Sequence, residues 1–569
     1  MENKMINGAE ILLESLSRLG VDTVFGYPGG TVIPIYDALY DFKKITHYFA
    51  RHEQGASHEA DGYARSTGKV GVCIATSGPG ATNLVTGIMT AHMDSVPLLA
   101  ITGQVGSSLL GKDAFQESDI VGITLPITKM NYLIKEVREL PMIVKEAHFI
   151  ASTGRPGPVL IDIPKNIQLD EISFKEYETL FNRDINLEGY LPNYKGHPKQ
   201  IKTAVEFIKQ AKKPLIIAGA GIIKSKAWKE LKELAEKRDI PVTTTLLGLG
   251  SFPSDHKLCL NMLGMHGSVA SNFATEQADL IIACGIRFDD RIAGDPEKFC
   301  KDAKIIHIDI DPAEIEKNKL IDVPIVGDLK GVIDEFNKRL EEVKNPEWVE
   351  QTSKWKADYP MMYVKTGEKL MPQEVLKALD HIVKGEAIVA TDVGQHQMWA
   401  AQYLRFNEPY RMLTSGGSGT MGFGLPAAIG AQVANPDKLV IAVVGDGGFQ
   451  MTFQELMLLS QYNLPVKILL LNNSYLGMVR QWQELFFDRR YSAVDLDINP
   501  DFEKIGAAYG IETRTIKTRE ELEMSLEGLI SSNKPVIINC IVEKEANVFP
   551  MIPSGKSAAH MIGLRGEIE

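Results

Sequence analysis

The chain has 569 residues, which suggests three or four domains of about 150 residues each. Its 44% hydrophobic and 24% charged content is ordinary for a globular protein, and its net charge of −12 argues against nucleic-acid binding, which normally needs a basic surface. Five cysteines are scattered without a CxxC pair, so neither a disulfide framework nor a zinc site is expected, and a reducing, intracellular environment is favoured.

The first predicted element is an amphipathic helix over residues 9–19. No signal or transit peptide is recognisable before it, which predicts a cytoplasmic protein. Two later stretches, residues 70–93 and 415–436, contain no formally charged residue. Both are rich in Gly, Ser, Thr and Pro, so neither is a convincing membrane span, and we expect no membrane association.

Three α/β blocks follow one another. Unbroken apolar runs between helical stretches predict buried parallel sheets, and hence an α/β fold of three consecutive open, mostly parallel-sheet domains. The expected boundaries are domains at 1–170, 199–340 and 370–569, joined by linkers at 171–198 and 341–369. The apolar runs that predict strands are residues 23–26, 71–76, 97–102, 158–163, 214–218, 280–284, 305–309, 443–444, 466–471 and 535–542.

The third block contains the most informative motif. One apolar strand ends on Gly-Asp-Gly-Gly at 445–448, and the next ends on Asn-Asn at 472–473. If these strands are parallel neighbours, Asp446 and Asn473 meet at their carboxyl ends, where open α/β sheets bind ligands. Two oxygen ligands suit Mg²⁺, which completes its coordination with water and phosphate, and the glycines let a diphosphate approach the backbone.

A second feature is the sequence Arg-His-Glu at 51–53 in the first block. A carboxylate such as Glu53 is more often a solvated loop residue or a helix N-terminal charge than a functional group. Its context favours function, because a helical stretch follows it, and Gly-rich turns follow at 76–83 and 103–104.

The two motifs together resemble the thiamine-diphosphate-dependent enzymes of the pyruvate oxidase and decarboxylase group. Within that group the chain is most similar, over almost its whole length, to the catalytic large subunits of acetohydroxyacid (acetolactate) synthases. The resemblance implies a pyrimidine-binding domain, a central FAD-binding Rossmann-like domain and a diphosphate-binding domain. The sharper signatures of the family lie at residues 113–117, 285–291 and 476–483.

The resemblance implies decarboxylation of pyruvate on thiamine diphosphate. The hydroxyethyl group then passes to pyruvate or 2-oxobutyrate, giving 2-acetolactate or 2-aceto-2-hydroxybutyrate in the first common step of branched-chain amino acid biosynthesis. Glu53 takes the role of the glutamate that hydrogen-bonds the pyrimidine of the cofactor. Met421, which by itself would be ordinary core filler, matches the wedge beneath the bent cofactor. The other implied thiamine diphosphate contacts are Gly394, Gln395, His396, Gly419, Gly445, Asp446, Gly447, Gly448 and Met478, with Asp446, Asn473 and Tyr475 on Mg²⁺.

Family resemblance also divides the recognition of the second 2-oxo acid between two residues. Arg287 would bind the carboxylate, and Trp482 would contact the extra methyl group of 2-oxobutyrate. Unaided, Arg287 would be a surface salt bridge with its acidic neighbours, and Trp482 a core aromatic. Gln116 and Lys165 match residues that line the substrate channel. The middle block implies an FAD site at Arg155, Gly219, Gly221, Gly264, Met265, His266, Gly285, Arg287, Asp289, Arg291, Asp309 and Asp328.

Several alternatives compete with this interpretation. An FAD-linked pyruvate oxidase would pass the same electrons to flavin, and a flavin-free acetolactate synthase is disfavoured by residues 287–291. Glyoxylate carboligases lack the glutamate found here at Glu53. A non-catalytic homologue would normally have lost Glu53, Asp446 or Asn473. The family implies a homodimer or tetramer whose sites combine Glu53 of one chain with Asp446 of another, and a small regulatory subunit is a frequent partner.

Overall fold

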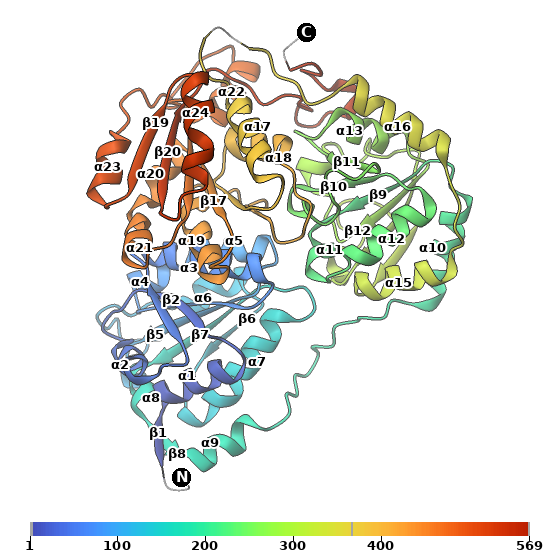
Figure 1. Ribbon diagram of the computed structural model, residues 1–569. Helices are drawn as coiled ribbons and strands as arrows, with labels where there is room; N and C mark the ends of the chain where they lie inside the picture. Colours follow the sequence, from blue (N-terminus) through green and yellow to red (C-terminus); the bar gives the residue numbers. More distant parts are fainter. Residues whose placement is uncertain (1–3, 366–367, 567–569) are drawn as a thin grey trace.

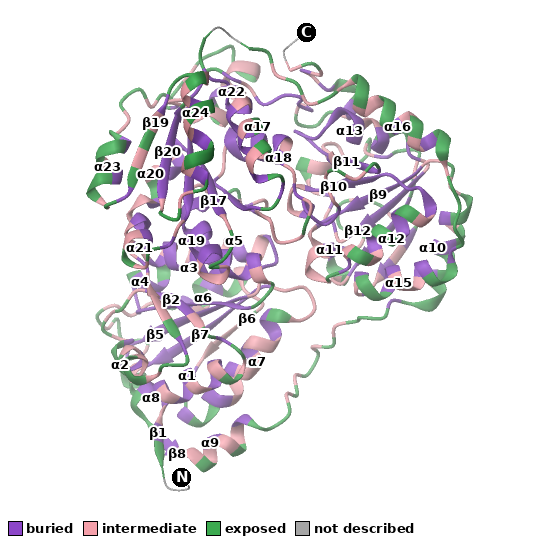
Figure 2. Ribbon diagram, viewed as in Figure 1, coloured by how far each residue is buried: buried purple, intermediate pink, exposed green. Residues whose placement is uncertain are grey.

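The computed structural model describes residues 4–365 and 368–566, so the outermost residues of the predicted first and third domains, and residues 366–367 of the second predicted linker, lie outside it. Within that part of the chain, three six-stranded sheets follow one another, and all of their neighbouring strands are parallel. Helices cover the sheets (Figure 1), and the strands form the buried interior of each domain (Figure 2). The predicted fold class is confirmed.

The sheet of the first domain has the order β3-β2-β4-β5-β7-β6. Its four central strands match predicted apolar runs, whereas β3 and β6 had no such signal. Both are edge strands, so one side of each contacts solvent or loops. Their sequences therefore contain polar as well as apolar residues. The strands are β2 (Thr23–Gly26), β3 (Thr46–Phe49), β4 (Gly71–Ala75), β5 (Leu98–Gln104), β6 (Met130–Leu133) and β7 (Pro158–Pro164).

Three helices of the first domain position the residues discussed below. The predicted N-terminal helix is α1 (Gly8–Arg18), with an Asn7 capping box. Helix α3 (Glu53–Thr67) begins at Glu53 and is buried over most of its length, and α5 (Val85–Met93) ends at the C-cap residue Asp94. Buried helices of this kind tolerate polar residues only where those residues find partners.

The predicted linker at 171–198 begins with ordered structure that belongs to the first domain. Strand β8 (Glu171–Ser173) pairs antiparallel with β1 (Met5–Asn7), and α9 (Phe174–Phe181) follows it directly. Tyr177 and Phe181 of α9 are buried in the same core as α1. The aromatic residues of this stretch therefore form part of a hydrophobic core, and the extended connection is shorter than predicted.

The middle sheet has the order β11-β10-β9-β12-β13-β14. Helix α16 (Pro346–Asp358), which lies in the predicted second linker, packs against it: Trp348 is buried, and its indole Nε1 donates to the Pro214 carbonyl at 2.9 Å. The strands are β9 (Pro214–Ala218), β10 (Val242–Thr244), β11 (Cys259–Met262), β12 (Leu280–Cys284), β13 (Lys304–Asp309) and β14 (Val323–Val326).

The third sheet has the order β16-β15-β17-β18-β20-β19, and it places the predicted metal motif as expected. Strands β17 and β18 are parallel neighbours, with Gly445 opposite Leu471, so Asp446 and Asn473 follow two adjacent carboxyl ends. The strands are β15 (Ile388–Thr391), β16 (Met412–Leu413), β17 (Val440–Gly445), β18 (Lys467–Asn472), β19 (Glu512–Ile516) and β20 (Val536–Ile541).

The first and third domains meet along α3 and α19 (Gly424–Ala434). Small residues allow this close approach: a Cβ at Gly62 would lie 2.1 Å from the Ala427 carbonyl oxygen, and one at Gly430 would lie 1.8 Å from the Glu59 carbonyl oxygen. After β20, the C-terminal segment returns to the middle domain, where the Ile552 amide donates to the Met265 carbonyl at 2.8 Å. The three domains therefore enclose a shared space.

Candidate active site

A cavity of about 840 Å³ is lined by residues of all three domains. Its size is in the upper part of the range for cofactor and ligand sites. Nearly all predicted residues of the middle and third domains line it. They are Gly221, Met265, His266, Gly285, Arg287, Asp289, Arg291, Asp309, Asp328, Gly394, Gln395, His396, Gly419, Met421, Gly445, Asp446, Gly447, Gly448, Asn473, Tyr475, Met478 and Trp482, together with Arg155 of the first domain.

Asp446 opens α20 (Asp446–Thr452) immediately after β17. Its Oδ2 accepts a hydrogen bond from Asn499 Nδ2 at 2.7 Å, whereas its buried Oδ1 has no partner among the described residues. Burial raises the pKa of Asp446 to about 6. An unpaired buried carboxylate oxygen is costly, so Asp446 fits a cation that completes its bonding.

Asn473 lies across from Asp446 and is oriented by two contacts. Its Oδ1 accepts from the Tyr475 amide at 3.2 Å, and its Nδ2 donates to Gln395 Oε1 at 3.3 Å. The described residues contain no group of three or more His, Cys, Asp and Glu side chains that could hold a metal. The arrangement therefore fits a cation that takes amide, carbonyl and phosphate oxygens, as Mg²⁺ does.

His396, near the start of α18 (Gln395–Tyr403), faces the glycine-rich strand end. Burial lowers its pKa to about 4, so the imidazole is neutral at pH 7, and its Nε2 has no partner within the described chain. A Cβ at Gly445 would lie 2.8 Å from His396 Nδ1, and one at Gly448 would lie 2.4 Å from Asp392 Oδ1. These glycines are thus required by the packing around them as well as by any phosphate above them.

The segment 415–421 also lines the cavity that contains Asp446 and His396, through Gly419 and Met421 among others. Gly419 has φ +61°, a left-handed conformation that favours glycine. The Thr420 amide donates to Ser415 Oγ at 3.0 Å, which closes the turn. Met421 is only partly buried and lines the cavity, which excludes its role as ordinary core filler.

Two predicted flavin-site glycines do not line the cavity. A Cβ at Gly219 would lie 2.2 Å from the Gly285 carbonyl oxygen, and one at Gly264, whose φ is +96°, would lie 2.5 Å from the Arg291 carbonyl oxygen. Both positions therefore serve close backbone packing beneath the cavity wall. Arg155 lines the cavity but is already paired, through Nη1, with Asp311 at 3.1 Å and Glu314 at 2.6 Å.

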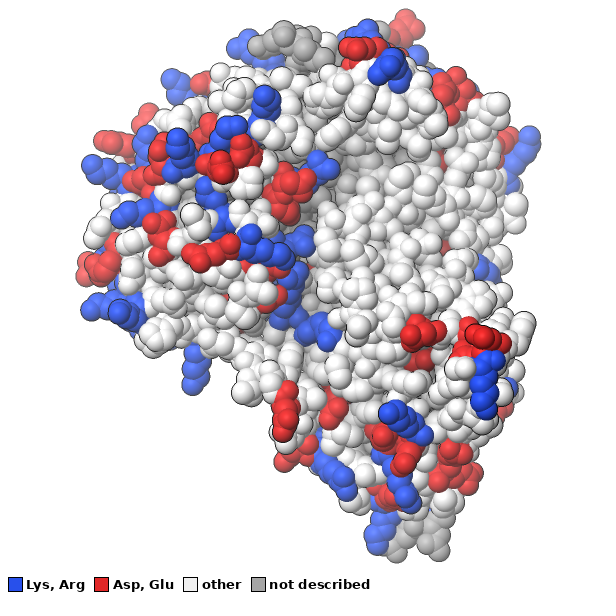
Figure 3. All heavy atoms as spheres, turned by 180° about the vertical axis from the view of Figure 1, so that it is seen from behind, with Lys and Arg blue, Asp and Glu red and all other residues white. Residues whose placement is uncertain are grey.

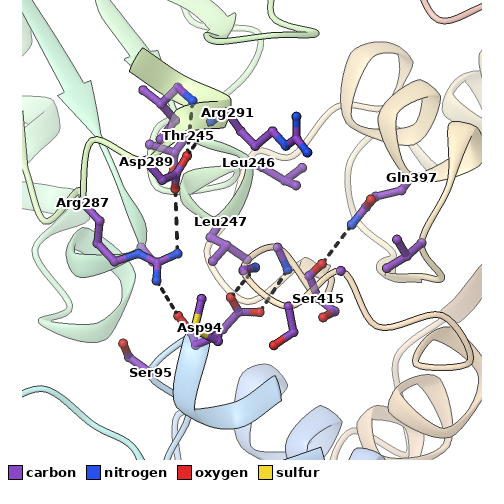
Figure 4. Close-up of a pocket in the computed structure, with 18 of the residues that line it drawn as sticks. Asp94, Ser95, Thr245, Leu246, Leu247, Arg287, Asp289, Arg291, Gln397 and Ser415 are labelled. Atoms are coloured by element: carbon purple, nitrogen blue, oxygen red, sulfur yellow. Dashed lines mark hydrogen bonds and ion pairs between the residues drawn. The ribbon is translucent and has the colours of Figure 1, made fainter. Parts of the chain in front are cut away.

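The two arginines of the segment 287–291 point to different places (Figure 4). Arg287 Nη1 donates to the Met93 carbonyl at 3.0 Å, and its Nη2 lies 3.8 Å from Asp289 Oδ2, so the salt bridge considered from sequence is present. The Arg291 guanidinium instead lies over the Trp482 ring, 5.6 Å from its centroid. Arg291, rather than Arg287, therefore shares the Trp482 wall of the cavity.

Three predicted residues of the first domain do not line this cavity: Glu53, Gln116 and Lys165. Glu53 starts α3, where its Oε2 accepts from Asn83 Nδ2 at 3.0 Å. Gln116 has φ +59° and packs over the Gly78 turn, and Lys165 opens α8 (Lys165–Leu169) after β7. All three follow carboxyl ends of the first sheet, but within one chain they are separated from the Asp446 cavity.

Sequence reasoning missed Asp94, Ser95 and Lys224, which also line the cavity. One signal was present, because Asp94 is the first formal charge after the charge-free stretch 70–93, and the second charge-free stretch begins at Ser415. The structure brings these two stretches together, since Asp94 accepts hydrogen bonds from the Gly416 and Gly417 amides. The isolated charge of Asp94 beside a long uncharged stretch was thus a sequence signal for its buried contact with Gly416 and Gly417.

Models of three protein domains match the chain. They are described as the N-terminal TPP binding domain, the central domain and the C-terminal TPP binding domain of thiamine pyrophosphate enzymes, and they match residues 6–123, 201–336 and 392–540. Each match falls on one of the three sheets. Among the described residues, the helices are too short or too polar to cross a membrane.

Curated relatives are similar over almost the whole chain. The acetolactate synthase large subunit of Lactococcus lactis subsp. lactis is 48% identical over 563 residues, which cover 99% of this chain and 97% of the relative. The acetolactate synthase large subunit of Pyropia yezoensis is also 48% identical, covering 98% and 95%. An acetolactate synthase of Arthrospira platensis is 48% identical, covering 99% and 98%.

Proposed function

Because this chain belongs to the acetolactate synthase large subunits, within the thiamine pyrophosphate enzymes, we propose that its large cavity is the site of acetolactate synthesis. Acetolactate synthase activity places the chain in branched-chain amino acid biosynthesis, and the pyruvate oxidase alternative has no support among these relatives. The substrates are pyruvate and, as the second 2-oxo acid, pyruvate or 2-oxobutyrate.

The residues around Asp446 fit thiamine diphosphate and Mg²⁺. The unpaired Asp446 Oδ1 and the Asn473 side chain, with Tyr475 beside them, would hold the metal, and the neutral His396 would donate from its free Nε2 to a phosphate oxygen. When bound, the thiazolium ring supplies the electron sink that allows pyruvate to lose CO₂. The unpaired Asp446 oxygen carries this proposal, because burial without a ligand would leave it unsatisfied.

The middle-domain end of the cavity fits FAD. Gly221 and Gly285 bring bare backbone to the wall, where a Cβ on Gly285 would lie 2.5 Å from the Gly221 Cα, and Asp309 and Asp328 lie nearby. A flat, extended cofactor needs such backbone access beside a parallel sheet. The chain would hold this group between the middle domain and Arg155 of the first domain.

We assign the carboxylate of the second 2-oxo acid to Arg291. Its guanidinium lies against Trp482, whereas Arg287 is held by the Met93 carbonyl and Asp289. A planar guanidinium gives bidentate contact to a carboxylate, and the indole beside it would contact the methyl group that distinguishes 2-oxobutyrate from pyruvate.

Changing Arg291 to Gln is expected to raise KM for the 2-oxo acid about 10- to 100-fold, because a charge-assisted contact is lost. Arg287→Gln should change this KM by less, since Arg287 donates to the Met93 carbonyl at 3.0 Å, whereas the partners of Arg291 are the more distant Asp290 carboxylate at 3.8 Å and Met265 Sδ at 3.6 Å. Steady-state acetolactate kinetics with both variants tests the assignment. The reverse ranking would return the carboxylate to Arg287.

Changing Trp482 to Leu is expected to abolish most of the preference for 2-oxobutyrate over pyruvate. One methylene in an apolar pocket is worth about 1–3 kcal/mol, or tens of fold in this choice. The product ratio in competition between the two acceptors measures it. Phe486→Leu is the matched control, because Phe486 packs edge-to-face against Trp482, with 5.5 Å between ring centroids, but does not line the cavity. An unchanged ratio in the Trp482 variant would remove its assigned role.

A second copy of the chain would complete the site with Glu53, Gln116 and Lys165. Figure 3 shows that the face over the third domain and the adjoining part of the first carries few charged side chains. Exposed apolar residues lie beside each half of the predicted site: Phe115 next to Gln116, and Met451 on the helix that starts at Asp446. Uncharged, apolar faces of this kind are typical of subunit contacts. A dimer or tetramer, a small regulatory subunit and a cytoplasmic location stay predictions.

The direct test is acetolactate formation by the purified chain with Mg²⁺, thiamine diphosphate and FAD. We expect acetolactate from pyruvate alone, and 2-aceto-2-hydroxybutyrate when 2-oxobutyrate is added. Mixing with pyruvate under anaerobic conditions separates the oxidase reaction, which would produce acetate with stoichiometric bleaching of the flavin. No acetolactate under these conditions would contradict the proposed function.

A further inference from the structure

The last turn of α5 is the place where the three domains touch one another. Met93 ends this helix in the first domain, and Asp94 and Ser95 follow it; Figure 4 shows Asp94 between Arg287 and the segment that contains Ser415. Ser95 has φ +56°, an uncommon conformation for a residue with a side chain. We call these three residues the α5 terminus.

Asp94 joins the α5 terminus to the third domain. Its Oδ1 accepts from the Gly417 amide at 2.7 Å, and its Oδ2 accepts from the Gly416 amide at 3.0 Å and from Arg65 Nη2 at 2.9 Å. The Asp94 side chain is 0% exposed. Three hydrogen-bond donors therefore face this carboxylate, and a buried anion needs such donors.

Arg65 holds the same segment from its other side. Its Nη1 donates to the Thr414 carbonyl at 2.8 Å, and its guanidinium lies 5.2 Å from the centroid of Phe423. Asp61 pairs with the Arg65 guanidinium one helical turn earlier on α3. Two residues of the first domain therefore hold the segment 414–423 in place. Asp94 accepts hydrogen bonds within the segment, and Arg65 contacts both of its ends.

Two basic side chains of the middle domain bind the carbonyls of the α5 terminus. Arg287 donates to the Met93 carbonyl at 3.0 Å, and Lys224, at the end of α11 (Ala220–Lys224), donates to the Ser95 carbonyl at 2.6 Å. Positive groups are favourable at a helix C-terminus, where unpaired carbonyls concentrate partial negative charge. Arg287 thus has a defined use that explains why it does not face Trp482.

We infer that Asp94 is a positioning residue for thiamine diphosphate: it fixes the segment 415–421, and through it Gly419 and Met421, against the first domain. This inference rests on the proposed function, because the resemblance makes Gly419 a thiamine diphosphate contact and Met421 the wedge beneath the bent cofactor. The inference gives the first domain two roles in thiamine diphosphate binding. The domain would supply Glu53 to the site of the partner chain while holding the cofactor segment of its own chain.

Changing Asp94 to Asn is expected to weaken thiamine diphosphate binding about 10- to 100-fold, as loss of an orienting contact does at metal and cofactor sites. Asparagine has the same shape, but its NH₂ group must face an N–H or guanidinium donor. Calorimetric titration of the chain with thiamine diphosphate at fixed Mg²⁺ measures the Kd. At saturating cofactor, kcat and the KM for pyruvate should return close to the unmutated values, and FAD retention should not change.

A second variant disturbs the same contact without altering charge. A Cβ at Gly417 would lie 2.8 Å from Asp94 Oδ1 and 2.9 Å from Met93 Cβ, so Gly417→Ala should push the segment away and raise the Kd similarly. Asp162→Asn is the control for a general loss of stability. Asp162 is also buried, but it accepts from Thr102 Oγ1 at 2.7 Å and Gln104 Nε2 at 2.9 Å within its own domain.

The outcomes separate the two ideas. If the unmutated chain does not bind thiamine diphosphate, the proposed function fails. If it binds, but Asp94→Asn and Gly417→Ala bind equally well, the positioning role is overturned. A Kd that rises as much in Asp162→Asn as in Asp94→Asn, or a kcat that saturating cofactor does not restore, would also overturn it, because the effect would not be specific to the segment.

Discussion

Changing Glu53 to Gln is expected to lower kcat for acetolactate by about 10²–10⁴-fold, the usual contribution of a proton-transfer group. The proposed task of Glu53 is to share a proton with the ring nitrogen of the cofactor's aminopyrimidine. Glutamine at position 53 keeps the shape of the side chain at the start of α3 and can still accept a hydrogen bond from Asn83. Cofactor binding should therefore persist. Steady-state rates and a parallel thiamine diphosphate titration test both parts of this expectation.

Glu59→Gln is the matched control on the same helix. Burial raises the pKa of Glu59 well above its usual range, helped by the neighbouring Glu455 carboxylate, which favours the neutral acid that glutamine resembles. We expect nearly unchanged activity in the Glu59 variant. Near-normal kcat in the Glu53 variant would reject the proton-sharing role.

The separation of Glu53 from the Asp446 cavity adds a test of assembly. Mixing chains that carry Glu53→Gln with chains that carry Asp446→Asn should restore activity, because one of the two sites in a mixed dimer receives both native residues. Random association in a C₂ dimer predicts recovery of about a quarter of the unmutated activity. No recovery after confirmed subunit exchange would mean that Glu53 and Asp446 act within one chain.

Changing Asp446 to Asn is expected to weaken Mg²⁺-dependent thiamine diphosphate binding at least about 30-fold, since truncating one partner of a buried charge pair costs about 2–5 kcal/mol. The Asp446 carboxylate places an unpaired oxygen in the cavity, and the amide removes the negative charge that the cation needs. Activity should then require much higher Mg²⁺ and cofactor. Titrations of each at a fixed excess of the other measure the change.

Asp501→Asn serves as the control in the same domain. Asp501 caps α23 (Phe502–Ala508), and half of its side-chain surface is exposed, so its loss should cost a little helix stability and no cofactor affinity. Equal cofactor affinity in the Asp446 variant and the unmutated chain would remove Asp446 from the metal site.

The sequence predicted the central strands and missed several edge or short ones, for a physical reason. A strand such as β4 is buried on both faces, so its apolar run is unbroken, whereas β3 and β6 lie at the edges of the same sheet. The two predicted linkers were wrong in part, because each contains a helix that aromatic residues anchor to a domain. Phe181 of α9 and Trp348 of α16 lie in polar stretches, but a few large side chains are enough to dock a helix on its domain.

The family resemblance identified most of the cavity wall, whereas strand-end geometry alone identified the Asp446 and Asn473 pair, because parallel strands end on one edge of a sheet. Asp446 and Asn473 needed only the pairing of β17 with β18. The resemblance assigned the acceptor carboxylate to Arg287 and not to Arg291, which stands four positions further along the chain. Only the packing shows that one reaches the α5 terminus and the other reaches Trp482.

By itself, then, the sequence determined the class of fold, the cofactor motif and the family, because these depend on residues that are close in the chain or on short matched patterns. The tertiary structure decided which groups share a space. Glu53 and Asp446 are separated within one chain, while Asp94 is joined to Gly416 and Gly417 more than 300 residues away. Contacts of this kind depend on how whole domains dock, and no local periodicity or spacing records the docking.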